Sequence, residues 1–260
     1  MSVEEIRNQL GSEVRAAAND IELFDSLPST NSYLMDAEPP PVGGWRAVIA
    51  REQTAGRGRA DHSWHSPQDG GLWLSFAYTF AEDAPIAGTM TLALGVAVAE
   101  AIKGAGVERV CIKWPNDLIV DDRKLGGLLV ELRGRTAVCG IGINTKPIDE
   151  RVLTAPPPVP PIDLGTLLGD VPSVHSLAGA IIDGSVSALS RYGKVGFAPF
   201  VAIWQQCDWL AGREVIVPDL QPVVRGRAAG IDDDGALIIE NDNVSFRVVA
   251  GTIRLADKVA

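Results

Sequence analysis

Cysteine is scarce in this sequence, and the few cysteines do not cluster. Cys111, Cys139 and Cys207 lie far apart, without the Cys-x-x-Cys spacing of metal sites and redox motifs. The sequence also lacks the closely spaced cysteines of the disulfide frameworks found in small secreted domains. We therefore expect three free, buried thiols in a protein of the reducing cytoplasm.

Long hydrophobic runs and targeting signals are also missing. The longest uncharged stretch, from Ala84 to Ala99, is shorter than the roughly 20 residues that cross a bilayer, and glycines and threonines interrupt it. This stretch predicts a buried helix instead. The N-terminal residues show no basic region followed by an apolar run, so no secretory signal is predicted. We expect no association with a membrane.

Positive charge is in deficit, with 23 basic against 33 acidic residues and a net charge of −10. A general nucleic-acid binder needs a basic surface that displaces counterions from phosphates, so this class is disfavoured and no DNA partner is expected. Against the acidic background, local basic clusters carry more information. One such cluster is formed by Arg57 and Arg59, and another by Arg123 and Lys124.

Several catalytic signatures are absent as well. The sequence contains no Gly-x-Ser-x-Gly elbow, no Walker loop and no dinucleotide fingerprint, which leaves serine-hydrolase and P-loop mechanisms unsupported. His62 and His65 are three residues apart, a spacing that permits metal ligation, but no cysteine or glutamate partner lies nearby. We expect both histidines to be exposed in a loop.

The hydrophobic pattern predicts a mixed helix and strand unit over most of the chain. Residues 1–20 are predicted to form one amphipathic helix, because Ile6, Leu10 and Val14 recur at intervals of four. A short helix is expected to follow Ser29. Further elements are predicted by strand-forming or helix-forming runs: strands at 21–25, 46–51, 72–79, 110–113, 118–120, 125–131 and 137–143, and helices at 91–103, 174–191 and 195–206.

The composition changes near the C-terminus. The five prolines of 154–161 exclude regular structure there and predict a surface excursion. From Gly212 onward, short β-rich runs alternate with polar turns, and they predict a small all-β barrel of roughly 45–50 residues. The expected strands of this barrel cover 214–218, 223–231, 236–240 and 245–249.

The first candidate for chemistry is a glycine-rich loop, Gln53-Thr54-Ala55-Gly56-Arg57-Gly58-Arg59. Alternating glycine and arginine allows the backbone to approach an anion closely while two guanidinium groups converge on it. A carboxylate beside a triphosphate is a suitable target, because arginine binds planar oxyanions with two hydrogen bonds. A flexible, solvated loop with incidental arginines is the alternative.

The second candidate is Lys113-Trp114-Pro115-Asn116-Asp117, a strand end followed by a bend. Lys113 would neutralise an α-phosphate, whereas Asn116 and Asp117 suit Mg²⁺ and the polar groups of a nucleotide. The alternative is a strand that ends in an Asx turn, with Trp114 in the core. That alternative gives no reason for a lysine at the end of an apolar strand.

Two further segments carry weaker signals. Lys124 precedes Gly126 and Gly127 in Arg123-Lys124-Leu125-Gly126-Gly127, where the glycines leave room for a ligand carboxylate beside the lysine. Asn144 closes the strand Gly140-Ile141-Gly142-Ile143-Asn144, and it would reach a ligand from the strand end. The alternatives are a solvated hairpin turn at Lys124 and a satisfied turn asparagine at Asn144.

Taken in order, these motifs resemble those of biotin–protein ligases. The resemblance rests on Ser29-Thr30-Asn31, Gly56–Arg59, Lys113–Asp117, Arg123–Gly127 and Gly140–Asn144, and in the tail on Gly212-Arg213-Glu214-Val215 and Gly230-Ile231-Asp232. It covers nearly the whole chain beyond residue 20. It implies an α+β fold: a class II aminoacyl-tRNA-synthetase-like mixed sheet flanked by helices, with a C-terminal SH3-like β-barrel. The expected parts are a helical extension over 1–20, a catalytic domain over 21–208 and the barrel over 209–260.

The resemblance also implies roles for individual residues. Arg59, Lys113 and Lys124 would be catalytic, and Asp117 would bind Mg²⁺. The implied biotin-binding residues are Ser29, Thr30, Asn31, Gln53, Gly56, Arg57, Gly58, Arg59, Lys124 and Gly126. The implied ATP-binding residues are Arg57, Arg59, Trp64, Lys113, Asn116, Asp117 and Asn144. The expected partners are the biotin carboxyl-carrier domain of a biotin-dependent carboxylase and a second copy of the chain in a homodimer.

The sequence departs from the family pattern at one place. Ala60, Asp61 and His62 follow Arg59, where the family usually has a glycine and a basic residue. An acidic side chain beside a nucleotide-binding loop is electrostatically unfavourable unless it points away or assists a metal. We therefore expect this loop to close differently over the biotinyl-adenylate intermediate that the resemblance implies.

Three other functions remain open from the sequence. A lipoate–protein ligase has a related fold and uses the same adenylation chemistry. A biotin-dependent repressor of this family carries an N-terminal helix-turn-helix domain, and the about twenty residues before the first predicted strand are fewer than such a domain needs. An inactive scaffold is the third, although it would have no reason to retain every cationic position.

Overall fold

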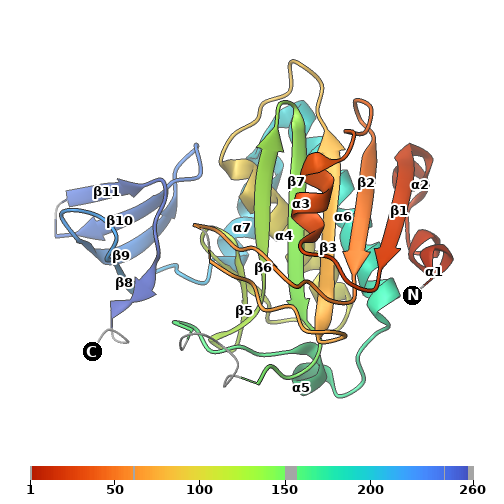
Figure 1. Cartoon of the computed structure of the whole chain (residues 1–260). Helices are drawn as coiled ribbons and strands as arrows, with labels where there is room; N and C mark the ends of the chain where they lie inside the picture. The colour runs from red at the N-terminus through yellow and green to blue at the C-terminus, as the bar shows by residue number, and fades with distance from the viewer. Residues whose placement is uncertain (1, 61, 150–156, 243, 257–260) are drawn as a thin grey trace.

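The computed structural model describes residues 2–60, 62–149, 157–242 and 244–256, and Figure 1 traces them. A seven-stranded mixed sheet with helices on both faces forms the larger part, and a five-stranded antiparallel sheet forms the C-terminal part. This is the α+β fold that the sequence predicts. None of the described helices is both long and apolar enough to cross a membrane.

The large sheet has the strand order β1-β2-β3-β7-β6-β5-β4. Only β1 and β2 run parallel, and every other neighbouring pair is antiparallel. Two consecutive residues with positive φ, Asp121 (49°) and Asp122 (58°), make the tight turn of the hairpin between β5 and β6. The strands are β1 (Ala18–Phe24), β2 (Trp45–Ala50), β3 (Gly71–Thr79), β4 (Cys111–Lys113), β5 (Asp117–Val120), β6 (Arg123–Arg133) and β7 (Thr136–Asn144).

The two faces of the sheet are covered in different ways. Behind the sheet in Figure 1 lie α4 (Thr89–Gly104), α6 (Val174–Val195) and α7 (Val201–Cys207), which bury most of the hydrophobic core. In front lies only the short α3 (Thr30–Asp36), whose Leu34 packs with Val48, Ala77 and Val138 in a small second cluster. Another short helix, α5 (Leu164–Leu168), lies below the sheet in that view. Much of the front face is therefore left for polar groups and loops.

The prediction of one helix over 1–20 is wrong in its continuity. The segment forms α1 (Val3–Asn8) and α2 (Ser12–Ala17), and β1 already begins at Ala18. The break falls at Gly11, a poor helix former whose backbone N–H donates to Asp183 Oδ1 at 2.6 Å. The predicted apolar face is nevertheless buried, so both helices pack on the core.

The predicted helix at 195–206 also starts later than expected. Gly196 ends α6 with a φ of 69°, a conformation that suits glycine at a helix C-terminus. A 3-10 turn over Ala198–Phe200, which contains Pro199, then precedes α7 at Val201. Proline and glycine interrupt the helical pattern because neither continues a helix well.

The C-terminal sheet has the order β11-β10-β9-β8-β12. Its last strand is additional to those predicted. Side chains next to β4 and in the β5–β6 turn contact the C-terminal part: Trp114 Nε1 donates to Gly235 O, in the β9–β10 turn, at 2.9 Å, and Asp122 accepts from Trp209 Nε1, in the segment that leads to β8, at 2.7 Å. The strands are β8 (Glu214–Val217), β9 (Val224–Ile231), β10 (Leu237–Asn241), β11 (Val244–Val248) and β12 (Arg254–Leu255).

Substitution of Ile6 by alanine tests whether the N-terminal helices belong to the core. Because Ile6 is fully buried, Ile6→Ala is expected to lower the free energy of unfolding by about 2–5 kcal/mol in urea denaturation. Val42 is 67% exposed, so Val42→Ala is a matched control with an expected change within about 0.5 kcal/mol. Equal stability of the two variants would contradict a core role for α1.

Candidate functional site

Strand register brings the candidate residues into one row across the front face. Residues directly opposite each other in antiparallel strands point to the same face of a sheet. Lys113 lies opposite Asp117, Asp117 opposite Gly127, and Gly127 opposite Gly142. The row therefore begins with a cation and a carboxylate and continues into two positions without side chains.

Two lysines share the carboxylate of this row. Lys124 Nζ lies 2.7 Å from Asp117 Oδ1, and Lys113 Nζ lies 3.8 Å from Asp117 Oδ2. Lys113 is only 6% exposed, and this burial lowers its pKa, although the charge of Asp117 opposes the shift. Removing a cation from water costs free energy that one carboxylate repays only in part.

Arg59 brings a third cation to the same end of the sheet. Its Nη1 donates to Asn116 Oδ1 at 3.5 Å, while Asn116 Nδ2 donates to Leu128 O at 2.7 Å and is thereby fixed on β6. Burial lowers the pKa of Arg59, and the nearby carboxylate of Asp117 acts in the opposite direction. Three cations around one carboxylate leave a net positive charge, which suits an anionic ligand.

Trp64 covers the two glycines of the row. A Cβ atom on Gly142 would lie 2.6 Å from Trp64 Nε1, and one on Gly127 would lie 3.4 Å from Trp64 Cζ3. The Lys124 ammonium lies 5.0 Å from the centroid of this indole ring, in a cation–π contact. Trp64 Nε1 is buried without a hydrogen-bond acceptor among the described residues. The glycines therefore make room for the indole beside the lysine.

A buried polar network begins at the N-terminus of α3. Gln53 Oε1 accepts from the Thr30 backbone N–H at 2.9 Å and from Thr30 Oγ1 at 3.1 Å, and Gln53 Nε2 donates to Ser66 Oγ at 2.8 Å. Thr30 Oγ1 shares a hydrogen bond of 2.7 Å with Ser75 Oγ, which donates to Asn31 Oδ1 at 2.6 Å. Ser29 caps the helix by accepting from the Ser32 N–H at 3.3 Å.

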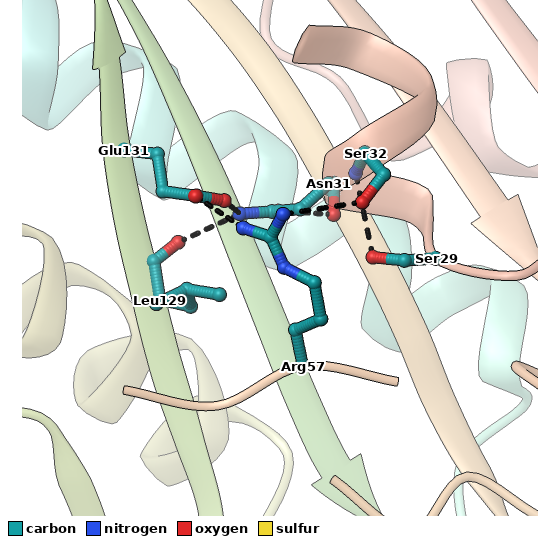
Figure 2. A network of polar contacts seen from close by, with 7 residues as sticks. Ser29, Asn31, Ser32, Arg57, Leu129 and Glu131 are labelled. Carbon is teal, nitrogen blue, oxygen red and sulfur yellow. Dashed lines mark hydrogen bonds and ion pairs between the residues drawn. The ribbon is translucent and has the colours of Figure 1, made fainter. Parts of the chain in front are cut away.

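Glu131 on β6 extends this network to the glycine-rich loop, as Figure 2 shows. One of its carboxylate oxygens pairs with Arg57, and the other accepts from Asn31 Nδ2 at 2.9 Å. Arg57 also donates to Ser32 Oγ at 3.3 Å. The two arginines of the loop thus point to different places, Arg57 to α3 and Arg59 to the strand end at Asn116.

Asn144 lies behind Lys124 and holds its backbone. Asn144 Nδ2 donates to Ile162 O at 3.0 Å and to Lys124 O at 3.3 Å, whereas its Oδ1 is buried without a donor among the described residues. The Lys124 N–H donates to Pro160 O at 2.7 Å, and the Ile162 N–H donates to Lys124 O at 3.0 Å. Part of the predicted proline-rich excursion therefore pairs with β6, while residues 150–156 lie outside the described chain.

The sequence-predicted residues form two neighbouring groups. Cations, Asn116, Asp117 and Trp64 meet at one end of the row, and Ser29, Thr30, Asn31, Gln53 and Arg57 meet at α3. Gly56 packs under the Trp64 carbonyl and Gly58 under His62, while a Cβ on Gly126 would meet the Gly142 carbonyl. Asp61 lies outside the described residues.

Sequence reasoning missed several members of the network: Ser32, Ser66, Ser75 and Glu131. Ser75 left a signal, since it is a polar residue in the middle of the buried, apolar β3. The expectation that His62 and His65 are exposed is confirmed. In the described part of the chain, no group of three or more His, Cys, Asp or Glu side chains could hold a metal ion.

Comparison with known proteins finds matches along most of the chain. Residues 23–146 match the biotin/lipoate A/B protein ligase family, and residues 211–254 match the biotin protein ligase C-terminal domain. The bifunctional ligase/repressor BirA of Escherichia coli is 33% identical over 90% of this chain and 74% of its own length. A biotin–[acetyl-CoA-carboxylase] ligase of Paracoccus denitrificans is 26% identical over 81% of this chain and 90% of its own.

A solved structure has a similar fold. It is the biotin protein ligase of Aquifex aeolicus in complex with biotin and ATP, with a TM-score of 0.76 and 24% identity. The similarity covers 92% of this chain and 99% of the Aquifex chain. At this level of identity the match supports the arrangement of the two sheets and their helices.

The charge of Lys113 is expected to cost stability. Because burial lowers its pKa below that of the unfolded chain, Lys113→Met is expected to raise the free energy of unfolding by on the order of 1 kcal/mol at pH 7. The gain in stability shrinks as the pH rises from the folded toward the unfolded pKa of the lysine. It vanishes above the unfolded pKa, because the amine is then neutral in both states. Urea denaturation at neutral and alkaline pH measures this dependence. Lys194→Met, at an exposed position of α6, is the control; a loss of stability in Lys113→Met at pH 7 would count against the idea.

Proposed function

We propose that this chain, a ligase that belongs to the biotin/lipoate A/B protein ligase family, joins biotin to a lysine of a carrier protein at the expense of ATP. In the first step, biotin and ATP form biotinyl-5′-AMP and pyrophosphate. In the second, the carrier lysine attacks the acyl carbon, forms an amide and releases AMP. The observation that carries the proposal is the convergence of Lys113, Lys124 and Arg59 around Asp117, at the end of the row that Trp64 covers.

The charge distribution supports an adenylation reaction. The biotin carboxylate must approach the α-phosphate of ATP, and two anions repel each other unless cations lie on both sides. Lys124 is the half-exposed cation and would bind the incoming carboxylate and the pentacoordinate phosphate. Lys113 and Arg59 would stabilise the negative charge that builds on the leaving pyrophosphate.

The polar network at α3 is the proposed site for the biotin head. A ureido ring offers two N–H donors and one carbonyl acceptor, and it needs fixed partners of both kinds. Thr30, Gln53 and the Ser29 hydroxyl supply such partners at the helix N-terminus. Asn31 and Arg57 border this group, so the biotin chain would run from α3 toward Lys124.

Trp64 and Asn144 are the proposed contacts of the nucleotide. The Trp64 indole forms an apolar wall next to Lys124, against which an adenosine moiety can pack. Asn144 keeps an amide oxygen buried without a partner in the described chain, which is costly unless a bound group donates to it. Asn116, held between Arg59 and Leu128, would contact the phosphates or ribose.

The residues at Asp117 fit a magnesium ion that is held mainly by phosphates. Mg²⁺ commonly takes one or two carboxylates and completes its shell with substrate phosphates and water. Asp117 Oδ1 is committed to Lys124, whereas Oδ2 lies 3.8 Å from Lys113 and is the oxygen that would reach the ion. When bound, the ion would supply additional charge neutralisation at the phosphates.

The acceptor lysine needs a path to the acyl carbon. A cavity of about 420 Å³ opens beside Arg59, between the start of α4, Trp114-Pro115 and the Asp234–Ala236 turn of the C-terminal sheet. We assign this cavity to the approach of the carrier, for which a biotin carboxyl-carrier domain of a carboxylase is the candidate. The lysine would attack as a neutral amine.

Removal of Lys124 is expected to abolish the first step. Lys124→Ala should lower biotin-dependent pyrophosphate release by at least about 10²-fold, because the variant loses the cation that lies between Asp117 and the Trp64 indole. Lys194→Ala, at an exposed site on α6, is the control and should keep wild-type rates. Near-normal release from a Lys124→Ala variant with an unchanged melting temperature would refute this role.

The family also contains lipoate ligases, so the acid must be tested directly. We expect ATP-dependent pyrophosphate release with biotin and none above background with lipoate, offered separately. Transfer is then measured as biotin bound to a carrier domain with and without ATP. Preference for lipoate in the first assay would contradict biotin as the acid and indicate a lipoate–protein ligase instead.

A further inference from the structure

A carboxylate on β6 contacts two of the side chains at the proposed biotin site, Asn31 on α3 and Arg57 in the glycine-rich loop. Glu131 lies on the front face beside α3, and its side chain is 26% exposed. We propose that Glu131 is a positioning residue that holds the glycine-rich loop and the start of α3 in register for the acid substrate. This inference rests on the proposed function, and it concerns a residue that the motifs of the sequence did not single out.

The two oxygens of Glu131 have different partners. One pairs with the guanidinium of Arg57 from the loop, and the other accepts from Asn31 Nδ2 at 2.9 Å (Figure 2). Charge-assisted hydrogen bonds of this kind are stronger than neutral ones and require defined geometry. Glu131 therefore bridges the glycine-rich loop and α3, which lie apart in the sequence.

The amide of Asn31 cannot turn away from this contact without loss. Its oxygen accepts from Ser75 Oγ at 2.6 Å, while its nitrogen is shared between Glu131 and Leu129 O. A Cβ atom on Gly140 would lie 2.5 Å from Asn31 Oδ1, so the amide lies directly on the backbone of β7. Asn31 is thus held on three sides, and Glu131 gains a fixed partner.

The same network holds the loop segment 53–66 at three places. Gln53 joins it through Thr30, Ser66 joins it through Gln53, and Arg57 joins it through Glu131. The hydrogen bonds from Gln53 and Ser66 fasten the two ends of the segment. The bond from Glu131 holds the loop at Arg57, between these two ends, on β6.

Because Glu131 pairs with only one of the two loop arginines, the two have different roles. The positive charge of Arg57 is balanced by Glu131, so Arg57 serves as a tether. Arg59 makes no ion pair with a described residue, and it remains available to an anion. The sequence suggested that both guanidinium groups converge on one anion. The geometry points to one that binds the loop in place and one that meets the substrate.

Glu131→Gln is the informative variant. Glutamine keeps an oxygen that can accept from Asn31 but loses the charge that holds Arg57. Glu131→Asp keeps the charge on a shorter side chain. Glu22→Gln is the control, because Glu22 is 24% exposed and likewise contacts an arginine, Arg46, and α3 through Tyr33.

Two measurements test the tether. The first is the rate of tryptic cleavage after Arg57 in the absence of substrate, followed by mass spectrometry. We expect cleavage in Glu131→Gln to be faster by about an order of magnitude than in wild type and in Glu22→Gln, because a released loop opens more often. The second is the KM for biotin in pyrophosphate release, expected to rise about three- to tenfold with kcat changed less than about twofold.

Glu131→Asp should lie between wild type and Glu131→Gln in both measurements, because it keeps the charge. Cleavage after Arg57 and a KM for biotin in Glu131→Gln that match those of Glu22→Gln would overturn the assignment. The cleavage rate does not depend on turnover. A fast-cleaving Glu131→Gln in a chain that shows no activity with biotin would therefore support the tether and count only against the proposed function.

Discussion

The site depends on the attraction between one carboxylate and two lysines at the end of a buried row. Lys113 is almost fully removed from water, and a buried ammonium is costly unless an opposite charge lies nearby. Asp117 supplies that charge to Lys113 and to Lys124 together. Because a single carboxylate does not neutralise two lysines and Arg59, the row keeps a positive field that an anionic ligand can complete.

The fold accommodates this charge because one face of the large sheet buries the hydrophobic core and the other carries the polar groups. The face toward α4 and α6 buries large apolar side chains and provides most of the hydrophobic stabilisation. The face toward α3 carries a small apolar cluster around Leu34, and beside it lie buried polar side chains and the glycines Gly127, Gly140 and Gly142. A row of glycines in an otherwise full sheet gives up packing energy, and here the indole of Trp64 and the amide of Asn31 occupy the space.

The C-terminal sheet is attached where the catalytic candidates begin. Asp122, in the turn that leads to Lys124, accepts from Trp209 and pairs with Arg213 at 2.9 Å. Trp114, next to Lys113, donates to Gly235 in the β9–β10 turn of the C-terminal sheet. A shift of the C-terminal sheet would thus change the positions of both Lys113 and Lys124, so the two parts of the chain are mechanically coupled.

Local patterns in the amino-acid sequence were sufficient to predict the order of most elements and the candidate cations. Strand-forming runs predicted the seven strands of the large sheet, and Lys113 at an apolar strand end was an anomaly that pointed to an anion. Helix continuity was harder to predict, because Ile6, Leu10 and Val14 keep a helical period across the break at Gly11. Such a pattern records burial on one side, which two short helices satisfy as well as one.

Which side chains meet could be seen only after the strands and loops were placed in three dimensions. Neighbouring arginines in one loop separate to Glu131 and Asn116, because partners supplied by distant strands outweigh closeness in the chain. Glu131 joined the site through register, which no local pattern in its own strand reveals, whereas Ser75 stood out as a polar residue in the buried β3. Local sequence determines secondary structure through short-range preferences and solvent exposure. A polar network depends instead on contacts across the sheet, and these exist only once the strands have paired.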